Sequence, residues 1–213
     1  MSNGLIVLVV LIALAVGWTV SVFNRLVRSR NRMNNAFAQI DVQLKRRHDL
    51  IPNLVNTARG YLQHERQTLE GVTLARQRAS DARQAVAVSF GNGGGASDRT
   101  RGGPAGKAEL LEALDRAESS LNTALGKFAM VVEAYPELKA DQTIMQLGEE
   151  LTSTENRIGF SRQAFNDAVN FHNDTIGQFP DSLVANACGF TVAGQLRSTT
   201  RAGERAPVMV NLS

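Results

Sequence analysis

The sequence contains few of the side chains on which catalysis and metal binding usually depend. It has one cysteine, Cys188, and three histidines, His48, His64 and His172. A single thiol cannot form an intramolecular disulfide, which excludes a disulfide-stabilised fold. The histidines lack the Glu-x-x-His spacing of di-metal bundles and the His-Glu-x-x-His spacing of zinc proteases. We therefore expect no metal, no cofactor, no catalytic residue and no enzyme activity.

Charge is missing from the start of the chain, where Gly4 to Phe23 form an apolar run and no charged side chain precedes Arg25. About 20 residues, each rising ~1.5 Å along a helix, match the ~30 Å hydrocarbon core of a bilayer. A cleaved signal peptide would need a basic start and a clear cleavage site, and the run has neither. The sequence predicts an extracytoplasmic N-terminus at residues 1–3 and a retained transmembrane helix at residues 4–23.

Basic side chains follow the run at once, at Arg25, Arg28, Arg30 and Arg32. Basic flanks of a membrane span stay in the cytoplasm, so we expect the N-terminus outside and the rest of the chain inside. Arg25, Arg28 and Arg32 share one helix face and are predicted to contact anionic lipid headgroups. The alternative is an ordinary stop-transfer flank. Nucleic acid is not an expected partner, because aromatic residues do not alternate with the basic ones.

Small residues recur within the run at Ala13, Gly17 and Ser21, four positions apart. Such a row lets two transmembrane helices approach closely, and it predicts a homo-oligomer that packs through these three residues. The alternative is that small residues are simply common in membrane helices.

Strand-like patterns are absent beyond the run, and apolar residues recur instead at steps of three and four, which is the helical period. Four stripes comprise Leu26, Met33, Phe37, Ile40 and Leu44; Ile51, Val55, Ala58, Leu62, Leu69 and Val72; Leu111, Leu114, Ala117, Leu121, Leu125 and Phe128; and Ile144, Leu147, Leu151, Ile158, Phe165, Ala168 and Ile176. They predict an all-α fold in which the transmembrane helix continues into an antiparallel, coiled-coil-like four-helix bundle over residues 24–180. The stripes predict no buried polar cluster, which an enzyme would require.

Proline and glycine suggest where the helices end. We expect Pro52 to interrupt the first two helices, with Asp49 capping the second of them. The pairs Tyr135–Pro136 and Phe179–Pro180 should end later helices. The Gly-rich segment 91–106 is predicted to be a flexible loop, and residues 181–213 an irregular tail.

His172 lies close to the last apolar stripe. It is interpreted as a hydrogen-bonded core or boundary histidine. The alternative is a pH-sensitive packing contact.

Several strings of residues resemble the bacterial LemA family, and together they cover nearly the whole chain. They are residues 24–32, the string Ile40-Asp-Val-Gln-Leu-Lys-Arg-Arg-His-Asp-Leu-Ile-Pro-Asn-Leu-Val55, residues 135–140, residues 149–158, residues 165–169 and Ala206-Pro207-Val208. The resemblance implies a LemA-like helical domain anchored in a bacterial inner membrane, with the N-terminus outside. It supplies no catalytic residue or cofactor. The family also resembles a magnetosome protein implicated in membrane invagination.

Two functions fit these features. The first is a non-enzymatic scaffold or adaptor, whose bundle mediates self-assembly, contacts with protein partners or contacts with the membrane surface, and so organises or remodels the membrane. The second is a sensor or signalling component, in which the continuous first helix transmits tilt or rotation. Only about three residues precede the span, which is too few for an external ligand-binding domain.

Overall fold

The computed structural model of the chain describes residues 2–62, 64–91 and 104–196, and these residues form six helices and no strand. Four helices are long: α1 (Ser2–Arg59), α2 (Arg66–Gly91), α3 (Pro104–Ala134) and α5 (Gln142–Gly177). Two are short: α4 (Pro136–Lys139) and α6 (Asp181–Ala187). The prediction of an all-α bundle of long helices with an apolar N-terminal helix is confirmed.

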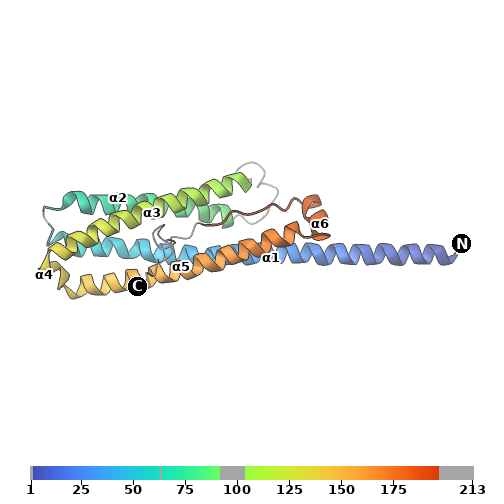
Figure 1. Cartoon of the computed structure of the whole chain (residues 1–213), viewed down its shortest axis with the longest axis horizontal. Helices are drawn as coiled ribbons and strands as arrows, with labels where there is room; N and C mark the ends of the chain where they lie inside the picture. The colour runs from blue at the N-terminus through green and yellow to red at the C-terminus, as the bar shows by residue number, and fades with distance from the viewer. Residues whose placement is uncertain (1, 63, 92–103, 197–213) are drawn as a thin grey trace, which may run out of the picture.

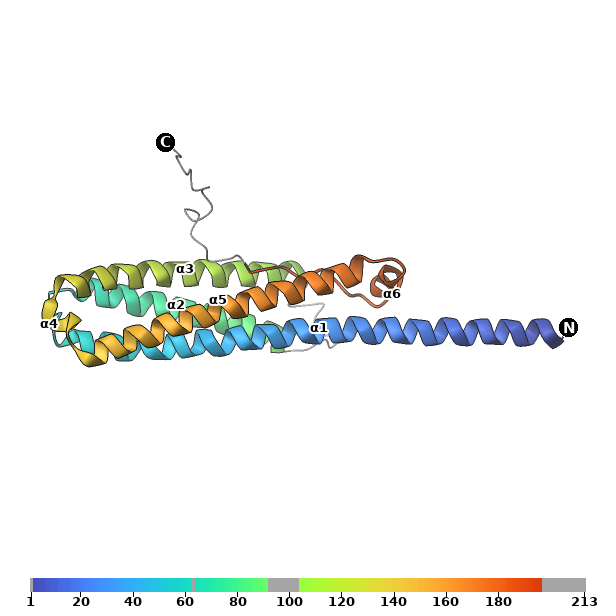
Figure 2. The same cartoon turned by 60° about the horizontal axis from the view of Figure 1, so that its bottom comes forward.

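The long helices lie side by side in a rod, from which the first part of α1 projects alone (Figure 1, Figure 2). α1 packs along α5, α2 packs along α3, and α2 also contacts α1. Successive long helices run in opposite directions, so α4 lies at the end of the rod far from the N-terminus. α6 lies at the opposite end, where the bare part of α1 begins (Figure 1). We call these the distal end and the proximal end.

The expected helix break before Pro52 is wrong, because α1 continues through this proline. Proline has no N–H, so the carbonyl of His48, four residues earlier, loses its helical donor. Arg76 of α2 replaces that donor: its Nε lies 3.0 Å from the His48 carbonyl oxygen. Asp49, expected to cap a second helix, is an exposed side chain within α1. One helix therefore extends from the apolar run to the distal end.

The first chain reversal lies between Arg59 and Arg66 and is tied to the reversal between α3 and α5. The hydroxyl of Tyr61 donates to Asp141 Oδ2 at 3.0 Å. Asp141 caps α5 as well, because its Oδ1 accepts from the backbone N–H of Thr143 at 2.8 Å and of Ile144 at 3.1 Å. The exposed pair therefore connects both turns of the distal end.

The segment after α5 corrects a second expectation, since residues 181–213 begin with a helix, α6, and not with an irregular tail. An extended stretch then returns along α5 and is held by asparagines of that helix. Asn170 accepts from the side-chain amide of Gln195, and two others bond the backbone. The side-chain amide of Asn173 donates to the Ala193 carbonyl at 3.0 Å and accepts from the Ala193 N–H at 2.8 Å. Asn166 makes the same pair of bonds with Leu196, at 2.8 and 3.0 Å.

The connection between α2 and α3 is shorter than the predicted loop 91–106, because α2 ends at Gly91 and α3 begins at Pro104. Residues 92–103, which make up most of this predicted loop, lie outside the described residues, as do residues 197–213 of the predicted tail.

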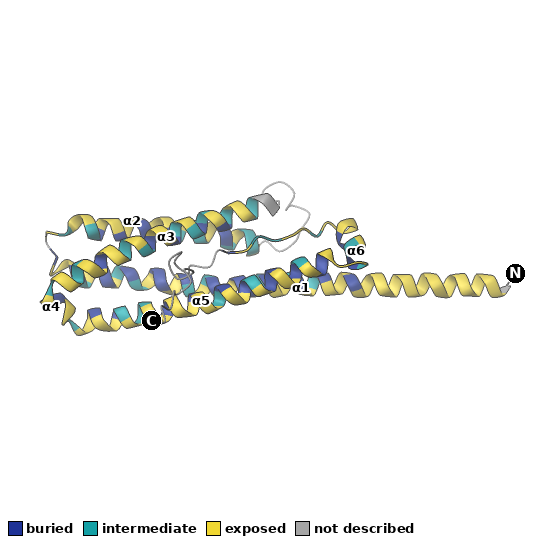
Figure 3. Ribbon diagram, viewed as in Figure 1, coloured by how far each residue is buried: buried dark blue, intermediate teal, exposed yellow. Residues whose placement is uncertain are grey.

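The buried core is divided along the rod into three apolar segments. The distal segment includes Ile51, Leu121 and Leu147, the central segment Leu44, Leu114 and Phe165, and the proximal segment Val22, Leu26, Ile176, Val184 and Ala185. Buried polar residues occupy the levels between them: Arg47, His48 and Glu118 on the distal side, Ser29 and His172 on the proximal side. Figure 3 shows the buried positions along the rod and the exposed surface of the projecting helix.

Candidate functional site

The projecting part of α1 presents a long, exposed apolar surface. Its large apolar side chains are exposed, because no other helix packs there (Figure 3). Within the described residues, one helix is long and apolar enough to cross a membrane, with a mean hydropathy of 2.8 in its most apolar window. Val22 is the first buried apolar residue along the helix. The bundle therefore begins where the apolar run ends.

The small residues Ala13, Gly17 and Ser21 lie on the exposed surface of this projecting part. A Cβ atom added at Gly17 would meet nothing within 4 Å. The row is accessible to a second helix, and its use as a packing face stays a prediction.

The predicted headgroup contacts Arg25, Arg28 and Arg32 lie at the start of the bundle, and two of them also contact the protein. Arg25 forms an ion pair with Asp181 of α6. Asp181 is buried with 3% of its side chain exposed, whereas Arg25 keeps 50% exposed. The guanidinium of Arg32 lies 5.5 Å from the centre of the Phe171 ring, a cation–π distance. Lipid contact by these arginines is still a prediction.

An open groove continues from these arginines between α1 and α5. Its lining consists of Arg28, Asn31, Arg32, Asn35, Ala36, Gln39, Ala164 and Ala168, and it holds about 420 Å³. The polar side chains come from α1 and the small ones from α5. The groove therefore presents the two cationic groups of Arg28 and Arg32 beside neutral polar side chains.

His172 is a buried histidine that hydrogen-bonds, as the first of its two interpretations expects. Its Nδ1 lies 2.7 Å from Ser29 Oγ, and that hydroxyl donates to the Leu26 carbonyl at 2.8 Å. Which of the two groups donates in the Ser29–His172 contact depends on the tautomer of the ring. Burial lowers the pKa of His172 below its usual 6.5, a backbone hydrogen bond at Thr191 opposes this, and the charge of Arg30 lowers the pKa further. The lowered pKa favours the neutral form of the ring.

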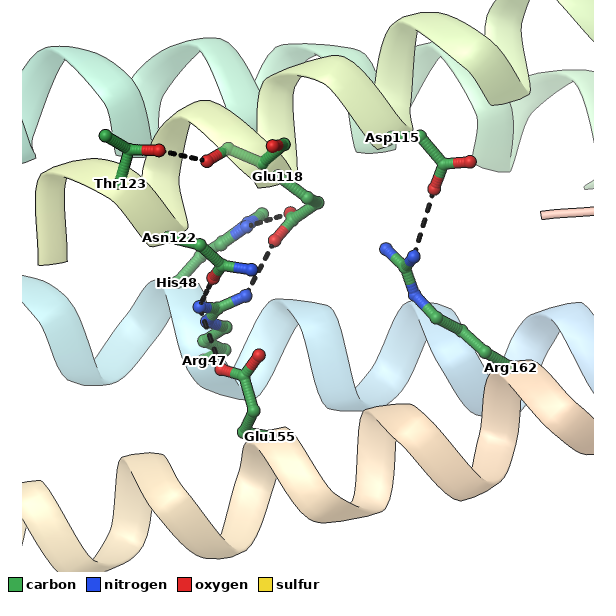
Figure 4. Close-up of polar contacts among 9 residues, drawn as sticks. Arg47, His48, Asp115, Glu118, Asn122, Thr123, Glu155 and Arg162 are labelled. Carbon is green, nitrogen blue, oxygen red and sulfur yellow. Dashed lines mark hydrogen bonds and ion pairs between the residues drawn. The ribbon is translucent and has the colours of Figure 1, made fainter. Parts of the chain in front are cut away.

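A buried polar cluster lies between the central and distal core segments, and the expectation of none is wrong (Figure 4). Glu118 of α3, only 1% exposed, accepts from two neighbours on α1. Arg47 Nη1 lies 3.0 Å from its Oε2, and His48 Nε2 lies 2.8 Å from its Oε1. Arg47 also bonds Asn122 of α3 and lies 2.9 Å from Glu155 of α5. We call these five residues the Glu118 cluster.

A second ion pair on the same side of the bundle joins α5 to α3, with Arg162 Nη1 3.0 Å from Asp115 Oδ1 (Figure 4). Together with the Glu118 cluster it connects three helices at defined levels. The charged groups in both places are paired with one another, and the α1–α5 groove is lined by other residues. Within the described part of the chain, no group of three or more His, Cys, Asp or Glu side chains is placed to hold a metal ion.

A signal for the Glu118 cluster was present in the stripes. Glu118 lies four residues after Leu114 and three before Leu121, and Arg162 stands in the same relation to Ile158 and Phe165. Each charged side chain therefore occupies a position of the apolar face. Such a position predicts a buried partner, although the partner's identity depends on how the helices are placed against one another.

Comparison with known proteins identifies relatives of the bundle. A sequence model of the LemA family matches residues 36–211. The magnetosome protein MamQ of Magnetospirillum gryphiswaldense is 25% identical over 158 residues, which is 72% of this chain and 56% of that protein. The protein LemA of Metamycoplasma hominis is 25% identical over 162 residues, 76% of this chain and 63% of that protein.

A further relative, magnetosome protein MamQ 2 of Paramagnetospirillum magneticum, is 32% identical over 79 residues, 37% of this chain and 29% of that protein. The matched part of the chain thus spans less than two thirds of the length of each of these relatives. The family match covers most of the bundle and begins at residue 36, after the apolar run.

Proposed function

The chain belongs to the LemA family, and on that premise we propose that it is a non-enzymatic, single-pass membrane protein whose helical bundle acts as a scaffold or adaptor. The observation that carries the proposal is the continuity of α1, which is 58 residues long. The same helix supplies the apolar run and one wall of every core segment. A bundle built on its own membrane helix is held at a fixed height and has no flexible linker.

The sidedness belongs to this proposal. We propose that the bundle lies in the cytoplasm and the N-terminus outside, in the inner membrane of a bacterium, because basic flanks of a membrane span stay in the cytoplasm. The names of the relatives, magnetosome protein and LemA, support a membrane-related role. Anionic lipid headgroups at Arg25, Arg28 and Arg32 would add to the attachment, at about 1 kcal/mol for each basic side chain near the surface.

The buried charges support a role without catalysis. A catalytic carboxylate or histidine needs access to a substrate, whereas Glu118, Arg47 and His48 are at most 3% exposed and pair with one another. Their arrangement fits a device that fixes how the helices are aligned along the rod, as buried polar residues do in coiled coils.

Self-assembly is the specific form of scaffolding that we propose, through the exposed row Ala13, Gly17 and Ser21. The test is gentle extraction of the full chain from native membranes, followed by imaging of particle size. We expect assembled particles, and smaller ones for Gly17→Leu, which fills the close-approach position. Val16→Leu, on another face of the helix, is the matched control and should leave particle size unchanged. A strictly monomeric protein, in extracts and after reconstitution, contradicts the proposal.

The second candidate is a transmembrane signalling component, and the continuity of α1 favours it as well. A rigid helix would transmit a rotation of the span directly to the core segments. Replacing residues 4–21 with an unrelated apolar helix of equal length tests this candidate. Loss of the signalling output while the protein still inserts in the membrane would support this candidate, and an unchanged signalling output would exclude it.

A further inference from the structure

α6 lies against the last turn of the apolar run. Its buried side chains, Val184 and Ala185, pack with Val22 and Leu26 of α1 in the proximal core segment. The Arg25–Asp181 ion pair fixes the same helix from the side. The position of α6 along α1 is therefore set by two independent contacts.

The opposite surface of this element is apolar and exposed. Phe179, in the turn before α6, is 81% exposed, and Leu183, within α6, is 61% exposed. Ala187, four residues further on, is exposed too. Large exposed apolar side chains gathered at one end of a molecule mark contact with a protein or a membrane. The question is which of the two covers them.

The level of α6 along α1 favours the membrane. A hydrocarbon core of ~30 Å accommodates about 20 helical residues at ~1.5 Å each, so a span that begins at Gly4 reaches the boundary near Phe23. Val22, on which α6 packs, falls in the last turn before that boundary. An element resting on Val22 is thus at the depth where hydrocarbon gives way to headgroups.

The charges around α6 fit the same surroundings. Asp181 is paired with Arg25, and Arg28, Arg30 and Arg32 follow on the next turns of α1. Asp174, in the last turn of α5, is an exposed acidic side chain at the same end of the rod. From the N-terminus inwards, apolar side chains are followed by a group that includes Phe23, Phe179 and Leu183, and then by arginines. This order matches that of an interfacial membrane contact.

We propose that the α5–α6 turn and α6 form a second membrane contact, with Phe179 and Leu183 inserted in the interfacial layer of the bilayer that α1 crosses. The inference rests on the proposed single-pass anchoring. A helix alone is free to rotate and tilt in a bilayer. A second contact to one side of α1 fixes both, and so determines which face of the rod is turned toward the membrane surface.

Site-directed spin labelling of the full chain in nanodiscs with anionic lipid tests this contact. Three variants, each with a single nitroxide label, are made in a Cys188→Ser background. The first is labelled at Leu183→Cys and the second at Val9→Cys, within the span. The third is labelled at Met145→Cys, an exposed apolar position near the distal end. Oxygen concentrates in the bilayer and a nickel chelate in water, so the ratio of their accessibilities reports depth.

The proposal expects the label at 183 to shift clearly toward oxygen, to a ratio several times that at 145 and below that at 9. Equal ratios at 183 and 145, with 9 still lipid-exposed, overturn the second contact and leave the anchor intact. A water-exposed label at 9 would overturn the anchor itself. Low accessibility to both reagents at 183, with dipolar broadening between labels, would show a second copy of the chain and would also overturn the proposal.

A paired variant checks that the apolar side chains hold the element in place. With the label on native Cys188, which is exposed after α6, Phe179→Ser together with Leu183→Ser should move the ratio toward the nickel chelate. Met145→Ser is the matched control at the distal end and should leave it unchanged. An unaltered ratio in the paired variant contradicts insertion by these two residues.

Discussion

The carbonyl of His48 depends on a side chain from another helix. Pro52 removes its backbone donor, and Arg76 Nε supplies the substitute at 3.0 Å. Arg76→Leu keeps an apolar stem and removes the donor, so we expect the free energy of unfolding to fall by about 1–3 kcal/mol, the cost of an unpaired buried carbonyl. Denaturant unfolding of the full chain in detergent, followed by circular dichroism, measures this loss.

Pro52→Ala provides the control for that prediction, since it restores the backbone donor. In the alanine background the same Arg76→Leu change should cost clearly less. Arg78→Leu, at an exposed position nearby on α2, should have little effect in either background. An Arg76 loss of equal size with and without Pro52 would contradict the role assigned to the carbonyl.

Glu118 balances the buried charge of Arg47 and also receives His48. Glu118→Leu leaves a buried guanidinium without its main partner, and we expect a loss of about 3–5 kcal/mol in unfolding free energy. Glu155→Leu removes a partner of Arg47 that is 46% exposed, and a loss below about 1 kcal/mol is expected. The double change Arg47→Leu with Glu118→Leu should recover much of the stability. If it costs as much as Glu118→Leu alone, the buried charge is not the cause.

His172 makes stability depend on pH in a defined direction. Its pKa in the folded chain is lowered, chiefly by burial, so the unfolded chain binds the proton more readily. Stability is then complete above the unfolded pKa of about 6.5 and falls as the pH drops below it. His172→Phe removes the titrating group, and its melting temperature should fall less between pH 7 and pH 5 than that of the parent chain. Equal slopes for both proteins would refute this contribution.

At the scale of elements, two asparagines on α5 hold the extended stretch that follows α6. They lie seven residues apart, about 10.5 Å along a helix, while Ala193 and Leu196 lie three residues apart, about 10 Å along an extended chain. The two spacings match, so both pairs of hydrogen bonds form without distortion. We expect Asn166→Ala with Asn173→Ala to increase amide exchange at residues 193–196, while Gln163→Ala, at an exposed position of the same helix, leaves it unchanged. Unchanged protection in the double variant would contradict the role of these bonds.

The helices could be predicted from the sequence to different extents. The apolar stripes indicated long antiparallel helices, and Pro136 was rightly expected to separate α3 from the last long helix, α5. The break before Pro52 was wrong, because the Arg76 bond that replaces the missing donor depends on tertiary structure. α6 was missed, because seven residues are too few for a helical period to stand out, and its stability comes from Val22, Leu26 and Arg25, more than 150 positions earlier in the chain.

For the candidate site, the apolar run and the arginines after it could be located from the sequence alone. The Glu118 cluster was missed although Glu118 occupies a stripe position. A charge on an apolar face indicates that a buried partner is needed, but the identity of that partner depends on how α3 packs against α1 and α5. The pairing of Arg25 with Asp181 could not be predicted, because the sequence offers each of them many possible partners of opposite charge.

At the scale of the whole molecule, the proposed anchoring through the continuous α1 sets how far the bundle extends from the bilayer. From Leu26 to Arg59 the helix rises about 50 Å, at 1.5 Å per residue. We expect energy transfer from a fluorophore at Met145→Cys, in a Cys188→Ser background, to report a distance of about that size from acceptors at the lipid surface. A fluorophore at Leu183→Cys is the control close to the surface. A distal label close to the bilayer would show that the rod lies down.

Synthesis of the chain gives the same helix a different significance. α1 is made first, and α5, which covers it more extensively than any other helix, is made last among the long helices. More than 100 residues separate the end of α1 from the end of α5, which at 5–20 residues per second takes on the order of 10 s. Throughout that time the apolar face from Leu26 to Ala58 has no α5 to cover it, directly beside a membrane. The interval before α5 arrives is therefore when the nascent chain is most exposed to wrong association.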